Sequence, residues 1–124
     1  MEMFATTSAA HRRASDCIIV GVYANGKPGD GAADVDTASQ GLIGKLVKQG
    51  DISGRPGTSL MLTRVDGVRA KRVLVIGLGK VSEFNIAAFR RAVTTAATQI
   101  KGSKINNLVS YLGLEPVAGT SPYY

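Results

Sequence analysis

The segment with the clearest chemical potential is Gly77-Leu78-Gly79-Lys80, which follows a run of apolar residues. Glycines let backbone N–H groups approach an anion and lysine adds a positive charge, so such a segment can bind phosphate. The spacing departs from the known motifs. A P-loop has the pattern G-x-x-x-x-G-K-[ST], and the dinucleotide fingerprint G-x-G-x-x-G needs glycine where Ser82 stands. We therefore expect a tight turn at the strand exit, with a nucleotide site as the alternative.

The sequence offers few candidate residues for metal binding or for acid–base catalysis. His11 is the only histidine and lies beside two arginines, so a zinc site would need an all-carboxylate ligand set. Asp34 and Asp36 form a D-x-D pair in a turn region, which we interpret as helix-start chemistry. The nine acidic residues mostly mark turns and element ends, and no two project from one strongly patterned element as an acid–base pair would. We expect no catalytic, cofactor-binding or metal-ligating residue.

Nucleophilic chemistry is also not expected. A Ser-His-Asp triad would have to recruit His11 from an N-terminal arm. Cys17 is the only cysteine, so no intrachain disulfide can form, and its place just before a strand-like run predicts a buried, inert thiol.

Composition narrows the class of protein. With 124 residues, 44% of them hydrophobic, the chain is long enough for one domain with a core. The net charge of +6 attracts nucleic acid weakly. Most of the cations, Arg55 among them, are spread along the chain, and the two clusters considered for nucleic acid are Arg90-Arg91 and Lys101/Lys104. No apolar stretch approaches the roughly 20 residues that span a bilayer, and the N-terminus does not read as a secretory signal. We expect a cytoplasmic protein without a membrane partner.

The elements that would position these residues begin with the unbroken apolar run Val73–Ile76, which predicts a strand covered on both faces. Asn85 is the expected N-cap of a helix, and the apolar stripe of that helix is formed by Phe89, Ala92, Val93, Ala96 and Ile100. Lys101 to Ser103 ends this helix, and Leu108–Leu112 supplies a returning strand. Strand, helix and returning strand form a βαβ unit, which makes the chain α/β.

Another apolar run, Ile18–Val22, predicts a second strand within residues 15–23, and Met3–Ser8 is an expected edge strand pairing with it. Residues 25–34 are rich in turn formers and predict a loop. A strand over Thr58–Val65 is joined to the strand at Arg72 by the turn dipeptide Asp66-Gly67. So short a link requires antiparallel neighbours, so the sheet is mixed.

One helix is expected between the loop and that strand. It opens at Asp36 or Thr37, where Thr37 and Gln40 match a capping box, and it ends at Gly50. Gly41 and Gly44 weaken a helix, and we expect close approach to a neighbouring element as their compensation.

Three stretches together resemble the N-terminal domain of the leucyl aminopeptidase family, the cytosolic M17 metallopeptidases. They are Cys17–Tyr23, Gly41–Gly57, which is similar to the family's helix and G-x-[IL]-x-G-[RK]-x-G link, and Arg72–Lys80 followed by Phe89–Ala92. Their order and separation carry the resemblance. It implies a macro-domain-like α/β fold, a three-layer arrangement of a mixed sheet flanked by helices.

The resemblance also implies an organisation and a function. Residues 1–14 are an arm or edge strand, 15–112 the aminopeptidase N-terminal domain, and 113–124 the start of an interdomain linker, with the catalytic domain absent. That domain would carry two divalent metals, zinc or manganese, and motifs such as N-T-D-A-E-G-R, which this sequence lacks. The fragment itself would have no cofactor.

Its role would be non-catalytic, in assembly and regulation of a cytosolic exopeptidase. The partners implied are the catalytic domain in cis, further subunits of a hexamer and, in some bacterial members, DNA. Two other functions stay open: a nucleic-acid-binding module, and a macro-domain-like binder of ADP-ribose or another nucleotide.

Overall fold

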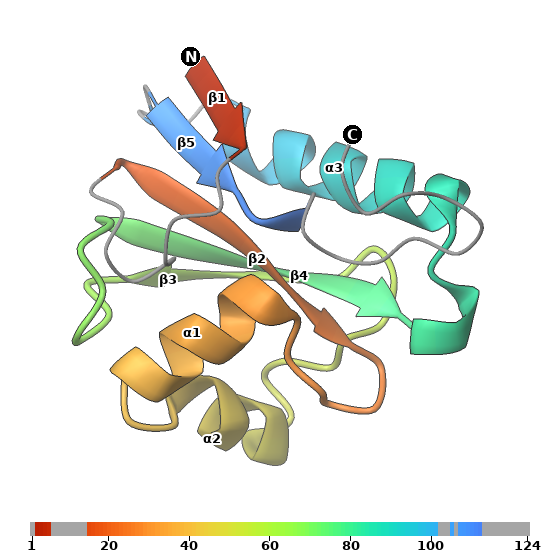
Figure 1. Cartoon of the computed structure of the whole chain (residues 1–124), viewed down its shortest axis with the longest axis horizontal. Coiled ribbons are helices and arrows are strands. Elements are labelled where there is room, and N and C mark those ends of the chain that lie inside the picture. Colours follow the sequence, from red (N-terminus) through yellow and green to blue (C-terminus); the bar gives the residue numbers. More distant parts are fainter. Residues whose placement is uncertain (1, 6–14, 102–104, 106, 113–124) are drawn as a thin grey trace.

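The computed structural model describes residues 2–5, 15–101, 105 and 107–112. In these ranges five strands form one sheet in the order β1-β5-β2-β4-β3 (Figure 1). The strands are β1 (Glu2–Ala5), β2 (Cys17–Tyr23), β3 (Ser59–Thr63), β4 (Arg72–Gly79) and β5 (Asn107–Ser110). The helices are α1 (Asp30–Ala38), α2 (Leu42–Gln49), the short 3-10 helix η2 (Val81–Glu83) and α3 (Ile86–Ile100). None of these helices is long and apolar enough to cross a membrane.

The sheet is the middle layer of three. Helices α1 and α2 cover one face and α3 covers the other (Figure 1). Two separate apolar clusters fill the spaces between the layers, one under each set of helices. The predicted three-layer α/β fold with a mixed sheet is confirmed. The expected linker at 113–124 and most of the expected arm, residues 6–14, lie outside the described residues.

The centre of the sheet is the parallel pair of β2 and β4, aligned from Ile18 opposite Val73 to Gly21 opposite Ile76. Alternate residues of β2 enter opposite clusters: Ile18 and Val20 pack toward α1, while Ile19 packs toward α3. Residues 73–76 of β4 are at most 2% exposed. Covering on both faces, predicted from the absence of polar alternation, is therefore confirmed.

The flanking strands agree with the sequence in direction and differ in one partner. Strand β3 pairs antiparallel with β4, as the short Asp66-Gly67 link requires, and β5 returns parallel beside β2. The expected edge strand exists as β1, but it pairs with β5 and not with β2. The predicted partner was wrong because β5, from the far end of the chain, occupies the free edge of β2.

The single predicted helix is in fact two. Helix α1 begins at Asp30, inside the expected 25–34 loop, and the chain then reverses at Gln40 and Gly41, whose φ angles are 60° and 93°. The Gly41 N–H donates to the Asp36 carbonyl and stabilises this reversal. The predicted capping box is wrong because Thr37 lies in the last turn of α1. A Cβ added at Gly41 would meet no atom within 4 Å, so the left-handed backbone conformation and not close approach explains this glycine.

Asp36 belongs to α1 but serves the start of α2. Its Oδ1 accepts the N–H of Gly44 in the first turn of α2 at 2.9 Å. A carboxylate here satisfies an N–H without an intrahelical partner and complements the helix dipole. The helix-start role of the D-x-D pair is thus found for Asp36, on the helix that follows its own.

Helix α3 matches its prediction closely. The Asn85 side chain caps it by accepting the Ala88 N–H at 2.9 Å, and the helix ends before Lys101. On its apolar stripe Ala92, Ala96 and Ile100 are buried, while Phe89 and Val93 pack at the margin of the same cluster. This stripe attaches α3 to the sheet.

Strand β4 continues through Gly79, so the turn expected at 77–80 is wrong. The loop of residues 54–58 folds back along the end of the strand. Gly77 donates its N–H to the Thr58 carbonyl at 2.9 Å, and Gly79 donates to the Gly54 carbonyl at 2.8 Å. A Cβ on Gly77 would overlap the carbonyl oxygen of Arg55. The glycine is needed because loop and strand backbones come this close.

The thiol of Cys17 is buried, as the sequence predicts. Burial raises the pKa of this thiol from 9.0 to about 11. A hydrogen bond from the Leu74 backbone and the charge of Arg72 act in the opposite direction, and the charge of Asp16 acts in the same direction as burial. The protonated thiol is the form that the core accommodates.

Two glycine substitutions should change stability in opposite directions. Gly77→Ala should destabilise the fold by about 1–3 kcal/mol, because the loop must move away from β4. Gly44→Ala should stabilise it by up to about 1 kcal/mol, since the new Cβ would meet Asp36 Oδ1 at an ordinary 3.8 Å inside a helix. Urea unfolding of both variants measures this, and an unaltered midpoint for Gly77→Ala would contradict the packing described.

Stability should also depend on the protonation of Cys17. The folded-state pKa of about 11 exceeds the ordinary 9.0. The free energy that the protonated thiol contributes to folding is therefore complete below pH 9 and is lost as the pH rises toward 11. The stability of the wild type minus that of Cys17→Ala should fall by about 2 kcal/mol between pH 8 and pH 11. Paired urea titrations at both pH values test this, and a pH-independent difference would contradict it.

Candidate functional site

A cavity of about 290 Å³ lies where β4 reaches its carboxyl end. Its lining comes from four separate parts of the chain: the residue after β2, the 54–58 loop, the end of β4 with η2, and the start of α3. The apolar part of the lining includes Pro56, Leu78 and Ala88. In open α/β sheets ligands bind outside the carboxyl ends of the strands, so this position is a natural one for a site.

Charged side chains form the rim of this cavity. Three are cationic and one is acidic, namely Arg55, Lys80, Arg91 and Glu83. All four residues are exposed, and none forms an ion pair with another residue in the described ranges. We call these four residues and the apolar lining the basic-rim cavity. Its charges are free to meet a ligand.

The segment Gly77–Lys80 contributes to this cavity differently from a phosphate-binding loop. The N–H groups of Gly77 and Gly79 already donate to carbonyls of the 54–58 loop, so neither is available to an anion. Within this segment, Lys80 is the residue that brings a charge to the cavity. Any anion here is held by side chains.

The other residues considered from the sequence do not gather at one place. Asp36 is engaged in capping α2, and His11 lies outside the described residues. Across the described ranges, no three His, Cys, Asp or Glu side chains are close enough to hold a metal ion.

The basic residues considered for nucleic acid lie at opposite ends of α3. Arg90 and Arg91 are in its second turn and Lys101 follows its last residue, a separation of about 15 Å along a helix of 1.5 Å rise. Lys104 falls outside the described residues. Of the described residues in this group, Arg90, Arg91 and Lys101, only Arg91 lines the cavity, and it stands three residues after Ala88 on the same side of the helix.

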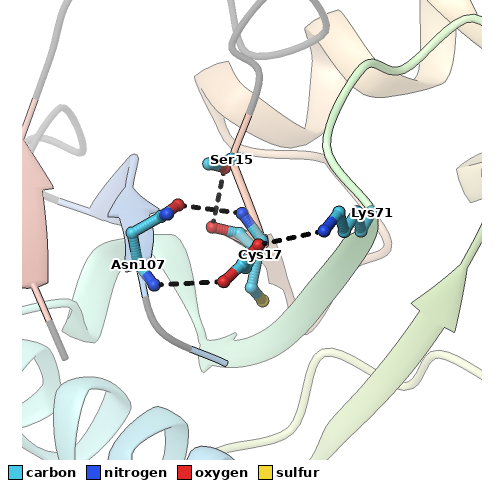
Figure 2. A network of polar contacts seen from close by, with 5 residues as sticks. Ser15, Cys17, Lys71 and Asn107 are labelled. Carbon is cyan, nitrogen blue, oxygen red and sulfur yellow. Dashed lines mark hydrogen bonds and ion pairs between the residues drawn. The ribbon is translucent and has the colours of Figure 1, made fainter. Parts of the chain in front are cut away.

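Figure 2 shows a polar network of residues from the start of β2, the start of β5 and the approach to β4. The network lies at the amino end of β2, whereas the cavity lies beyond its carboxyl end. The backbone N–H of Asp16 donates to Oδ1 of Asn107 at 2.9 Å, and its carboxylate accepts the Asn107 N–H at 3.4 Å. Lys71 Nζ lies 3.5 Å from Asp16 Oδ1, and the Ser15 hydroxyl donates to the Cys17 carbonyl. These contacts join β2 to β5 and to the approach to β4, so the network is structural.

Sequence reasoning missed the gathering of Arg55 and Glu83 with Lys80 and Arg91. Arg55 was one of many dispersed cations, and Glu83 one of the acids at element ends. The available signal was the Gly-Arg-Pro-Gly stretch at 54–57, whose turn residues predict a reversal but not which strand the loop then meets.

Comparison with solved structures supports the fold. Tomato leucine aminopeptidase, solved as a mutant, superimposes with a TM-score of 0.67 at 23% identity over 98% of this chain and 24% of its own. The macrodomain of Mycobacterium tuberculosis DarG gives a TM-score of 0.65 at 15% identity over 87% of this chain and 74% of its own. Both identities are low, so these likenesses concern the fold alone.

Sequence comparison goes further. A probable cytosol aminopeptidase of Ralstonia nicotianae is 42% identical over 88% of this chain and 22% of its own length. One from Cupriavidus taiwanensis is 46% identical over 73% of this chain and 17% of its own. The chain thus spans about a fifth of the length of these curated relatives. Residues 19–120 match the profile described as "Cytosol aminopeptidase family, N-terminal domain". The chain belongs to the cytosol aminopeptidase family and corresponds to its N-terminal domain.

Proposed function

We propose that this domain is the non-catalytic part of a cytoplasmic leucyl aminopeptidase, in which it serves assembly and regulation. The parent would be a two-metal exopeptidase, with zinc or manganese, that releases N-terminal amino acids. The proposal rests on the match of residues 19–120 to the family's N-terminal domain. It also rests on the length of the relatives, of which this chain spans about a fifth. The domain comprises residues 15–112, and residues 113–124 begin the link to a catalytic domain in cis.

The use of the carboxylates supports a structural role. The Asp16 carboxylate accepts the Asn107 N–H and so connects the amino ends of β2 and β5, and the Asp36 carboxylate caps α2. Carboxylates that bind divalent metals must offer their oxygens to the cation. Here each of these two carboxylates accepts a hydrogen bond from a backbone N–H, which fits metal chemistry located in another part of the parent.

Exposed apolar side chains support a role in assembly. Val81 in η2 is 46% exposed and Ile86 at the start of α3 is 38% exposed. Burying such side chains against another domain or subunit stabilises an assembly. We assign them to a contact within the hexamer of the parent.

DNA binding by the assembled parent is part of the same proposal, supported by the net charge of +6. The isolated domain separates its cations along α3, so it should bind DNA weakly and only at low salt.

The isolated chain should not hydrolyse a leucine anilide, with or without added manganese, because the metal ligands would lie in the other domain. The measurement is the release of the chromophore by the purified 124-residue chain, with a full-length cytosol aminopeptidase as positive control. Turnover by the chain that rises with metal concentration would contradict the proposal.

Within the full-length parent, Val81→Ser combined with Ile86→Ser should shift the hexamer toward smaller species, because two apolar contacts are lost. Size-exclusion chromatography with light scattering measures this. The control is Gln99→Ala, at an exposed polar residue near the end of α3. An unchanged hexamer in the double variant would rule out this surface as the contact.

A further inference from the structure

The basic-rim cavity combines an apolar lining with three cations that form no ion pair with a described residue. We propose that it binds a small organic phosphate monoester. The apolar part of the ligand lies against Pro56, Leu78 and Ala88, and the phosphate lies among the three cations of the rim. All of the side chains assigned to this site belong to this chain.

Cavity size limits the ligand. Pockets for small organic molecules span roughly 300–1,000 Å³, and 290 Å³ lies just below that range. The cavity suits a molecule of mononucleotide size better than a dinucleotide. The mixture of an apolar lining with a few convergent polar groups is also the usual composition of such pockets.

Charge balance selects the chemical class. Three cations and one carboxylate leave a net charge of +2 at the rim. A phosphate monoester carries about −1.5 to −2 at pH 7, which neutralises this charge, whereas a single carboxylate leaves half of it unmatched. Arg55 and Arg91 can each present two parallel N–H groups to phosphate oxygens, and Lys80 adds a point charge.

Helix α3 adds to the positive potential. Its first turn contributes Ala88 to the lining, so the amino end of this 15-residue helix lies at the cavity. The partial positive charge of a helix N-terminus favours an anion there. Arg91 stands three residues after Ala88 and therefore on the same side of the helix, one turn further on.

The backbone that carries the rim is held in place. The Arg55 carbonyl accepts both the N–H and the hydroxyl of Thr58, and the Arg55 N–H donates to the Ser53 hydroxyl at 3.3 Å. The N–H of Gly79, the residue before Lys80, donates a hydrogen bond to the Gly54 carbonyl. Loop and strand end are thus joined before a ligand arrives, so binding requires ordering of side chains only.

Isothermal titration of the full 124-residue chain with AMP at low salt tests the proposal. We expect saturable binding of one AMP per chain. Adenosine lacks the phosphate and inorganic phosphate lacks the apolar part, so each should bind at least about tenfold more weakly. No binding of AMP, or equal binding of AMP and adenosine, would overturn the proposal.

Variants of neighbouring arginines provide the matched control. Arg91→Gln should weaken AMP binding about tenfold because it removes a charge-assisted hydrogen bond, and Lys80→Gln should weaken it similarly. Arg90→Gln, which removes the same charge from a residue outside the cavity, should change binding less than twofold. Circular dichroism verifies that each variant is folded.

Equal losses in Arg90→Gln and Arg91→Gln would indicate diffuse electrostatic attraction and overturn the site. A titration with a short DNA duplex separates the two sources of phosphate. Duplex binding that is lost equally in both variants, without AMP binding, would assign the cations to a polyanion and likewise overturn the proposal.

Discussion

The structure depends on the parallel pairing of β2 with β4 in the middle of the sheet. Parallel strands at this position need covering on both faces, because their side chains project alternately into two cores. Residues such as Ile18 and Ile19, adjacent in sequence, therefore stabilise opposite layers. If one of the two helical layers were removed, the face of this strand pair that it covers would be exposed to water. The two faces of the fold are thus coupled through one pair of strands.

The carboxyl end of that pair combines packing and site geometry. Gly77 allows the 54–58 loop to approach β4 closely, and the hydrogen bonds of Gly77 and Gly79 hold the loop there. The same contact that excludes a glycine-type phosphate loop places Arg55 beside the strand end. The segment Gly77–Lys80 therefore contributes to the basic-rim cavity through the Lys80 side chain and not through the N–H groups of its glycines.

Sequence patterns were most informative where local and tertiary requirements agree. The run at 73–76, the stripe of α3 and the cap at Asn85 each follow from periodicity or from a single local hydrogen bond, and each is confirmed. The divided helix was missed because apolar spacing continues across Gln40 and Gly41, and only the backbone reversal separates α1 from α2. The partner of β1 was missed because strand pairing depends on segments far apart in the chain.

The sequence alone determined the α/β class, the mixed sheet and the family, because apolar periodicity, turn residues and ordered motifs are local properties of the chain. The tertiary structure alone decided that Arg55, Lys80, Glu83 and Arg91 share one cavity. Their proximity arises from a loop folded against β4 and a helix packed on the sheet. Contacts of that kind depend on backbone approach and packing between elements, which spacing along a single sequence does not encode.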